Sequence, residues 1–279
     1  MDIWYLIQSA VLGIVEGLTE FLPISSTGHL IIASEIINFS NTPGADTFIV
    51  GIQAGAILAV CWYYRERIIS ILTGFFSSEK DRRLAVNTVA AFLPAAVIGL
   101  LVAKHIKTYL FNPFTVSIAL VVGGLIILYI ESLYKKGRLK TRVKTIDDMS
   151  IKDALLVGFM QCLAMIPGTS RSGSTIIGGL VLGLSRKAAT EFSFFLSIPT
   201  IFGATAYDIY KSWGEIEVAD PSGFIVGTIV SFISALIVIH WLLNYVSKNS
   251  FNAFGWYRII FGLIILVLTG SGLVAWQDI

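Results

Sequence analysis

Two stretches of the sequence decide the fold: EGLTEFLPISSTGH at residues 16–29 and QCLAMIPGTSRSGST at residues 161–175. Their central parts, residues 23–28 and 167–173, interrupt two apolar regions, residues 3–37 and 154–184. Proline, glycine, serine and threonine together end one helix and cap the next. Irregular backbone at membrane depth is tolerated only where protein buries it or where it lines a wet cavity. We therefore expect two broken, re-entrant helical hairpins in a membrane protein.

The composition also indicates a membrane protein. Of the 279 residues, 55% are hydrophobic and 14% are charged, whereas an average soluble domain has about 25% charged residues. The mean hydropathy of +0.79 excludes a disordered chain and a nucleic-acid-binding protein, because neither carries so much apolar surface. Bilayer lipids are thus expected partners and nucleic acid is not. Two isolated cysteines, Cys61 and Cys162, are expected to be buried packing residues.

Six further segments are long and apolar enough to cross a bilayer, which takes about 20 residues of helix. They are residues 48–64, 85–104, 114–133, 188–207, 224–243 and 256–276. The expected fold is therefore all-α, a polytopic membrane protein with six transmembrane helices and the two broken hairpins.

The two hairpins resemble each other in sequence. A shift of 145 residues aligns residues 13–32 with residues 158–177 and makes six of the twenty positions identical, Ser25 with Ser170 among them. Three expected spans follow each hairpin. We therefore divide the single membrane domain into two halves, residues 1–145 and 146–279, and an odd number of crossings between them predicts an inverted-topology repeat.

The basic residues indicate the orientation of the chain. Fifteen of the 20 lysines and arginines lie in residues 65–83, in residues 134–152 or at Arg186, Lys187 and Lys248. The opposite connections hold Lys107 and Lys211 beside acidic residues that include Glu217. Positive charge favours the cytoplasmic side, so both termini are expected outside. The first hairpin then enters from outside and the second from inside.

The first hairpin carries groups typical of an active site. Glu16 and Glu20 lie one helical turn apart on one face, and ionisable residues within apolar helices indicate function; a solvated pair at a hairpin end is the alternative. Downstream, Ser26 and His29 are spaced i, i+3, which suits a hydroxyl nucleophile with a neighbouring base or proton carrier. Simple helix capping is the alternative for the hydroxyls of this loop.

The second hairpin carries the complementary charge. Arg171 lies among hydroxyl side chains where a helix should begin, and backbone amides, a helix dipole and a guanidinium together suit an anion such as phosphate. Alternatively, Arg171 only neutralises Glu16 or Glu20. An acid pair facing an anion site at bilayer depth predicts a lipid substrate with an anionic head group. The expected reaction is hydrolysis or transfer of its phosphoryl group.

Residues 13–29 and 161–175 resemble the two signature motifs of the undecaprenyl-pyrophosphate phosphatases, also called bacitracin-resistance proteins. The similarity extends through residues 191–194 and 203–206 and covers essentially the whole chain. This resemblance implies an enzyme of the bacterial cell membrane that hydrolyses undecaprenyl diphosphate, a C55 isoprenoid diphosphate, to undecaprenyl phosphate and inorganic phosphate. It also implies recycling of this carrier for cell-wall synthesis, resistance to bacitracin and an active site that opens outward.

The motifs assign site residues by the same resemblance. The functional positions are Glu16, Glu20, Ser26, His29 and Arg171. The loop positions expected to bind substrate are Ser25, Thr27, Gly28, Thr169, Ser170, Ser172 and Gly173. The expected roles are nucleophile or phosphate ligand for Ser26, proton carrier for His29 and diphosphate clamp for Arg171. The two glutamates act as acid and base or hold Mg²⁺ or Ca²⁺, because diphosphate and carboxylate oxygens can share a hard cation.

Two other interpretations remain open at this point. Inverted repeats with broken helices are also typical of transporters, so a lipid-phosphate flippase or an anion transporter could use the same anion site. A phosphatase of the two-histidine type is disfavoured, because it needs a histidine six residues after Arg171 and Ile177 stands there. The spacings Gly13/Gly17 and Gly51/Gly55 fit both packing within the chain and a homodimer.

The topology can be tested by cysteine labelling in a chain whose native cysteines are replaced. Single cysteines at Lys80 and Arg138 are expected to react with an impermeant thiol reagent only from the cytoplasmic side, and one at Glu217 only from outside. Labelling of all three from the same side would overturn the inverted repeat.

Overall fold

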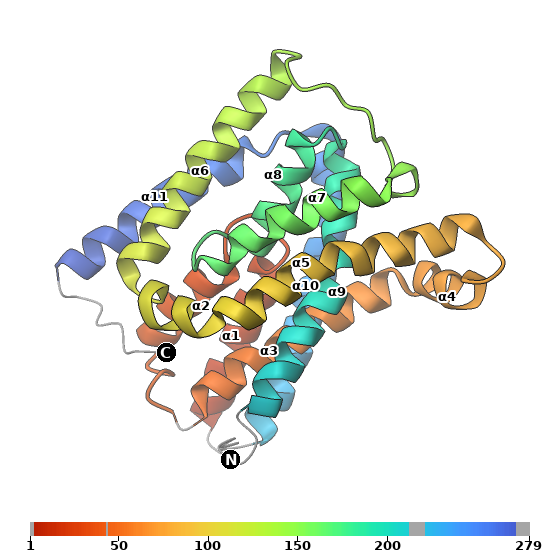
Figure 1. The fold of residues 1–279 in the computed structure, drawn as a ribbon. Helices are drawn as coiled ribbons and strands as arrows, with labels where there is room; N and C mark the ends of the chain where they lie inside the picture. Colours follow the sequence, from red (N-terminus) through yellow and green to blue (C-terminus); the bar gives the residue numbers. More distant parts are fainter. Residues whose placement is uncertain (1–2, 43, 212–220, 272–279) are drawn as a thin grey trace.

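A computed structural model describes residues 3–42, 44–211 and 221–271, and this part of the chain is helical without a β-sheet (Figure 1). Its helices in chain order are α1 (Ile3–Thr19), α2 (Ser26–Ile36), α3 (Ala45–Tyr63), α4 (Arg65–Gly74), α5 (Glu79–Leu110), α6 (Pro113–Lys135), η1 (Ile146–Asp148), α7 (Ile151–Gln161), η2 (Cys162–Met165), α8 (Arg171–Val181), α9 (Arg186–Lys211), α10 (Pro221–Lys248) and α11 (Asn252–Gly270). The predicted all-α class is confirmed.

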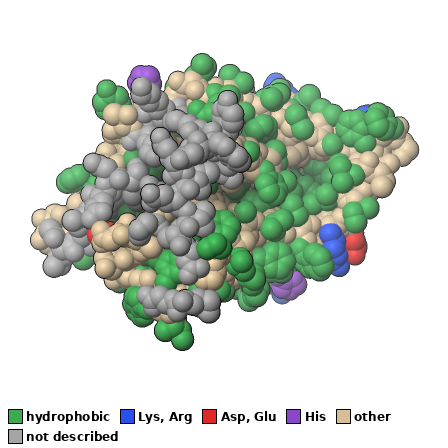
Figure 2. Space-filling model, turned by 90° about the horizontal axis from the view of Figure 1, so that it is seen from below, with side chains coloured by type: hydrophobic (Ala, Val, Ile, Leu, Met, Phe, Trp, Pro, Cys, Tyr) green, Lys and Arg blue, Asp and Glu red, His purple; other side chains and the backbone are tan. Residues whose placement is uncertain are grey.

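Four of these helices, α5, α6, α10 and α11, are long and apolar enough to cross a membrane, and the bent pair α3 and α4 makes a fifth if it counts as one span. The helices α3 and α4 meet at an angle of 72°. Apolar side chains cover much of the described surface in Figure 2, as expected for helices that face lipid. The protein is therefore a membrane-embedded, multi-pass protein.

One of the six expected spans, residues 188–207, differs from the other five. Residues 188–207 do form part of one helix, α9, but α9 does not reach the apolar character of a membrane span. The reason is visible in its buried face, where Thr190, Ser193 and Ser197 lie among phenylalanines. The last expected span ends at residue 276, and residues 272–276 lie outside the described residues, as do Glu217 and both chain ends.

Small residues let α1 lie directly on α10. A Cβ atom added at Gly13 or Gly17 would collide with the backbone oxygen of Gly227 or Ser231, respectively. Gly55 approaches the backbone of α10 from α3 in the same way. These spacings therefore serve packing within the chain and carry no argument for a homodimer. Both cysteines are free and half-buried, not fully buried as the sequence predicts.

The two hairpins share their local geometry. The helices α2 and α8 are both 11 residues long, and they begin at aligned positions, Ser26 and Arg171. The serine before each helix has a positive φ, 71° at Ser25 and 77° at Ser170. Such angles are strained for a residue with a Cβ atom, so both serines are held in place by their surroundings.

Candidate active site

The two hairpin loops are joined by the Glu20 carboxylate. Its Oε1 accepts a hydrogen bond of 2.9 Å from Arg171 Nη2, and its Oε2 accepts one of 2.6 Å from Ser26 Oγ. The side chains of Glu20 and Arg171 are only 9% and 11% exposed. The structure thus brings together three of the predicted site residues, and each oxygen of the carboxylate has its own partner.

The Arg171 guanidinium is held on its other side by α9. Its Nη1 donates to the backbone oxygen of Ser193 at 2.8 Å and lies 3.1 Å from the Ser193 hydroxyl. That hydroxyl is 2.7 Å from Thr175 Oγ1. Arg171 Nε is buried without a partner among the described residues, so one donor of this planar fork is free for an anion.

Hydroxyl groups fasten the second loop to the first. Ser172 Oγ donates to the backbone oxygen of Leu22 at 2.7 Å and lies 3.0 Å from Ser170 Oγ. Ser170 Oγ in turn caps α8 by accepting from Gly173 N at 3.1 Å. These predicted loop residues lie at the junction of the two hairpins. Gly28, in contrast, faces Val116 of α6.

Glu16 lies one turn before Glu20 on α1 and is fully buried. Both of its carboxylate oxygens lack a hydrogen-bond partner among the described residues. A buried polar group without a partner is costly, so Glu16 is free to bind a proton or a cation.

His29 makes two hydrogen bonds that the sequence does not predict. Its Nδ1 is 2.7 Å from the backbone oxygen of Ser25, and its Nε2 is 2.6 Å from the Tyr257 hydroxyl. The ring also stacks on Phe261 of α11 with a centroid distance of 4.2 Å. Within the described part of the chain, neither nitrogen is hydrogen-bonded to Ser26. The i, i+3 spacing therefore does not pair these side chains, because the helix carbonyl and α11 take both nitrogens.

Arg258 is a site-forming residue that the sequence analysis missed. It is 1% exposed, and its guanidinium donates to five backbone oxygens at 2.9–3.3 Å. The acceptors are Pro23 in the first loop, Gly168 and Thr169 in the second, and Ala119 and Leu120 in α6. A signal was present, because an arginine within an expected span is itself unusual.

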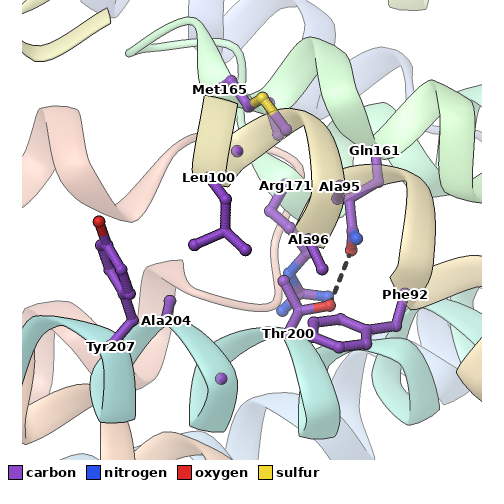
Figure 3. A pocket seen from close by; sticks show the side chains of 13 residues that line it. Phe92, Ala95, Ala96, Leu100, Gln161, Met165, Arg171, Thr200, Ala204 and Tyr207 are labelled. Carbon is purple, nitrogen blue, oxygen red and sulfur yellow. Dashed lines mark hydrogen bonds between the residues drawn. The ribbon is translucent and has the colours of Figure 1, made fainter. Parts of the chain in front are cut away.

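A groove of about 570 Å³ leads to Arg171 between α5 and α9 (Figure 3). Small side chains line it on both sides, with Ala96 and Gly99 on α5 and Gly203 and Ala204 on α9. Thr200 and Gln161 lie near Arg171, and Thr200 Oγ1 donates to Gln161 Oε1 at 3.2 Å. Tyr207, in contrast, lines the groove away from Arg171. The groove thus has an apolar body and a cationic end, and both suit an amphiphile with an anionic head.

Comparison with known proteins identifies the family. The family model described as "Bacitracin resistance protein BacA" matches residues 9–264. The chain belongs to the BacA family. It is 52% identical to Undecaprenyl-diphosphatase 2 of Rhodospirillum rubrum over 99% of this chain and all of that protein. It is also 55% identical to the undecaprenyl-diphosphatase of Nitrosomonas europaea, over 99% of both chains.

The BacA match covers the first hairpin from residue 9 onward, the whole second hairpin, both broken loops and the part of α11 that carries Arg258. The resemblance of the chain to this family is therefore confirmed over both motifs and the segments between and after them.

Replacement of Arg258 by methionine is expected to lower the free energy of unfolding by about 3 kcal/mol or more, because several buried carbonyls lose their donor at once. The measurement is thermal and denaturant unfolding of the purified protein in detergent. Arg138→Met serves as the control, since Arg138 is an exposed arginine in the loop after α6. Equal stability of the two variants would contradict the role of Arg258 in fastening the loops.

Proposed function

We propose that this BacA family member is a membrane-embedded phosphoric anhydride hydrolase that converts undecaprenyl diphosphate to undecaprenyl phosphate and inorganic phosphate. This activity recycles the lipid carrier of cell-wall synthesis and confers resistance to bacitracin. The observation that carries the proposal is the position of Arg171, which ends the apolar groove and contacts the Glu20 carboxylate. Full-length relatives named undecaprenyl-diphosphatase support the same activity.

The two parts of the substrate, its diphosphate and its isoprenoid chain, bind to different parts of the site. The diphosphate binds Arg171 and the hydroxyl and amide groups of the loops at the beginnings of α2 and α8, since helix N-termini favour anions. The isoprenoid occupies the groove between α5 and α9, where its branched chain meets alanine and glycine. Bilayer lipid surrounds the rest of the chain.

The chemistry centres on Ser26 and Glu20. Ser26 either attacks the terminal phosphorus or binds one of its oxygens while water attacks. In both cases the bond from that phosphorus to the bridging oxygen breaks, and undecaprenyl phosphate leaves. Where Ser26 attacks, water then hydrolyses the phosphoserine, which releases inorganic phosphate and restores the Ser26 hydroxyl. Glu20 already accepts the Ser26 hydrogen at 2.6 Å, so it is placed to take the proton that is released. Arg171 stabilises the negative charge that develops on the phosphate oxygens.

For a divalent cation, Mg²⁺ or Ca²⁺, the site offers one carboxylate without a hydrogen-bond partner among the described residues, that of Glu16. Among the described residues no group of three metal-binding side chains comes together, and both oxygens of Glu20 have partners. Glu16 is the carboxylate whose oxygens are unpartnered. We propose that Glu16 and the substrate's diphosphate oxygens would hold the ion. When bound, it would neutralise part of the diphosphate charge.

We also propose the finer topology. Six spans and two re-entrant hairpins form an inverted repeat of residues 1–145 and 146–279 in the bacterial cell membrane, with both termini outside and the site open to that side. The matching start points and positive φ angles of the two hairpins support the repeat. The placement of the basic residues supports the orientation. A flippase or an anion transporter is not favoured, because the full-length relatives carry diphosphatase names.

The function is tested by phosphate release from undecaprenyl diphosphate by the purified protein in detergent, where no transport can occur. Arg171→Lys keeps the charge but loses the planar fork, so we expect measurable substrate binding and a turnover reduced by about 10² or more. Arg171→Ala is expected to lose both. Near-normal kinetics of Arg171→Lys would show that Arg171 only neutralises Glu20. Absence of phosphate release by the wild-type protein would overturn the proposed function.

The groove is tested at Gly99, where an added Cβ atom meets only Met165 Cε, at 3.7 Å. Gly99→Leu is expected to raise the KM for the C55 diphosphate about tenfold, because leucine occupies the space of the isoprenoid. A C5 prenyl diphosphate is expected to be hydrolysed as by the wild type, since it does not reach this far. Gly270→Leu on α11 is the matched control, with no neighbouring atom within 4 Å. An equal KM change in both variants would exclude the groove as the tail site.

A further inference from the structure

The hydrogen bonds of His29 fix where its proton lies. A carbonyl oxygen only accepts, so the contact of 2.7 Å with Ser25 requires a proton on Nδ1. The Nε2 of a neutral ring is then an acceptor, and the Tyr257 hydroxyl, 2.6 Å away, donates to it. Both nitrogens are thus satisfied by protein groups, and neither contacts the Ser26 hydroxyl.

The carbonyl that His29 holds belongs to the strained residue of the loop. Ser25 has φ 71° and ψ 95° and precedes Ser26 directly. Its side chain does not cap α2, so the conformation has no support from the usual N-cap contact. The hydrogen bond from His29 restrains Ser25, and the backbone of Ser25 sets the position from which Ser26 Oγ reaches Glu20.

The second hairpin repeats this contact with a different side chain. Ser174 aligns with His29 under the 145-residue shift, and its Oγ donates to the backbone oxygen of Ser170 at 2.9 Å. Ser170 is the residue that aligns with Ser25 and has φ 77°. A serine hydroxyl does not titrate near neutral pH, so what the two positions share is the hydrogen bond to the strained carbonyl and not acid–base chemistry.

We infer that His29 is a positioning residue, which holds the Ser25 carbonyl and through it Ser26, and that Tyr257 fixes the ring in this role. The inference replaces the proton-carrier role that the sequence predicts for His29. It rests on the proposed diphosphatase function, because Ser26 is the group that His29 positions.

The decisive comparison is His29→Ser against His29→Ala. Neither side chain titrates near neutral pH, both remove the ring that stacks on Phe261, and they differ by the hydroxyl that Ser174 uses in the second hairpin. We expect kcat of His29→Ala to fall about tenfold, as for the loss of one hydrogen bond, and kcat of His29→Ser to stay within about threefold of the wild type. The pH profile of kcat in His29→Ser is expected to keep the wild-type shape.

Three results would overturn the inference. Equal losses of about 10² or more in both variants would be the result for a proton carrier, as would the disappearance of one limb of the pH profile in His29→Ser. Wild-type activity of His29→Ala would show that the contact is dispensable. If His29→Ala fails to give a monodisperse protein in detergent, kcat of His29→Ser decides alone. A kcat within about threefold of the wild type supports the positioning role, and a loss of about 10² overturns it.

Tyr257→Phe provides an independent test, because it keeps the aromatic ring and removes the hydroxyl. It is expected to lower kcat about threefold in the wild type and to have no effect in His29→Ser, which has no Nε2. A loss of the same size in both backgrounds would exclude coupling between Tyr257 and His29.

Hydrogen exchange separates this inference from the proposed function. The amides of residues 25–28 are expected to exchange about tenfold faster in His29→Ala than in His29→Ser, in the absence of substrate. Equal exchange would overturn the positioning role, whereas lack of turnover by the wild type would overturn the diphosphatase function.

Discussion

The buried contact between Glu20 and Arg171 is the constraint on which the rest of the site depends. Isolated charges at this depth would be very costly, and here each one compensates the other across two hairpins that lie far apart in the sequence. The carboxylate has a second partner in Ser26, and the guanidinium has a second partner in Ser193. The same pairing that allows both charges to be buried therefore also brings the Ser26 hydroxyl and the Arg171 guanidinium to one carboxylate.

The backbone carbonyls of the two broken loops also need partners, in their case hydrogen-bond donors. Their carbonyls lie away from water and outside regular helices, so they require donors from elsewhere. Arg258 supplies several donors from one side chain, and Ser172 supplies another from the opposite loop. The start of α11, which carries Arg258, is fixed in turn by buried Glu131, which accepts hydrogen bonds from Phe251 N and from Arg186. The irregular backbone of the site is thus supported from α6 and α11.

The sequence predicted the residues whose chemistry contrasts with their surroundings. Glu20 and Arg171 stand in apolar segments, and the family motifs place them in one site, where the structure has them. Arg258 was not predicted as a site residue, because one charge changes the mean hydropathy of the strongly apolar span around it only slightly. The partners of His29 could not be predicted, because the direction of its ring depends on Tyr257 and Phe261 of α11, and sequence spacing on α2 carries no information about that contact.

The close packing of α1 on α10 has a consequence for how the protein is made. Gly13 and Gly17 meet Gly227 and Ser231 backbone to backbone, so the first hairpin has its permanent neighbour near the other end of the chain. Until α10 has been synthesised and inserted, the face of α1 that carries Gly13 and Gly17 lacks the helix that covers it. The hairpin that enters the bilayer first is therefore among the last elements to be completed, because its packing partner is synthesised near the end of the chain.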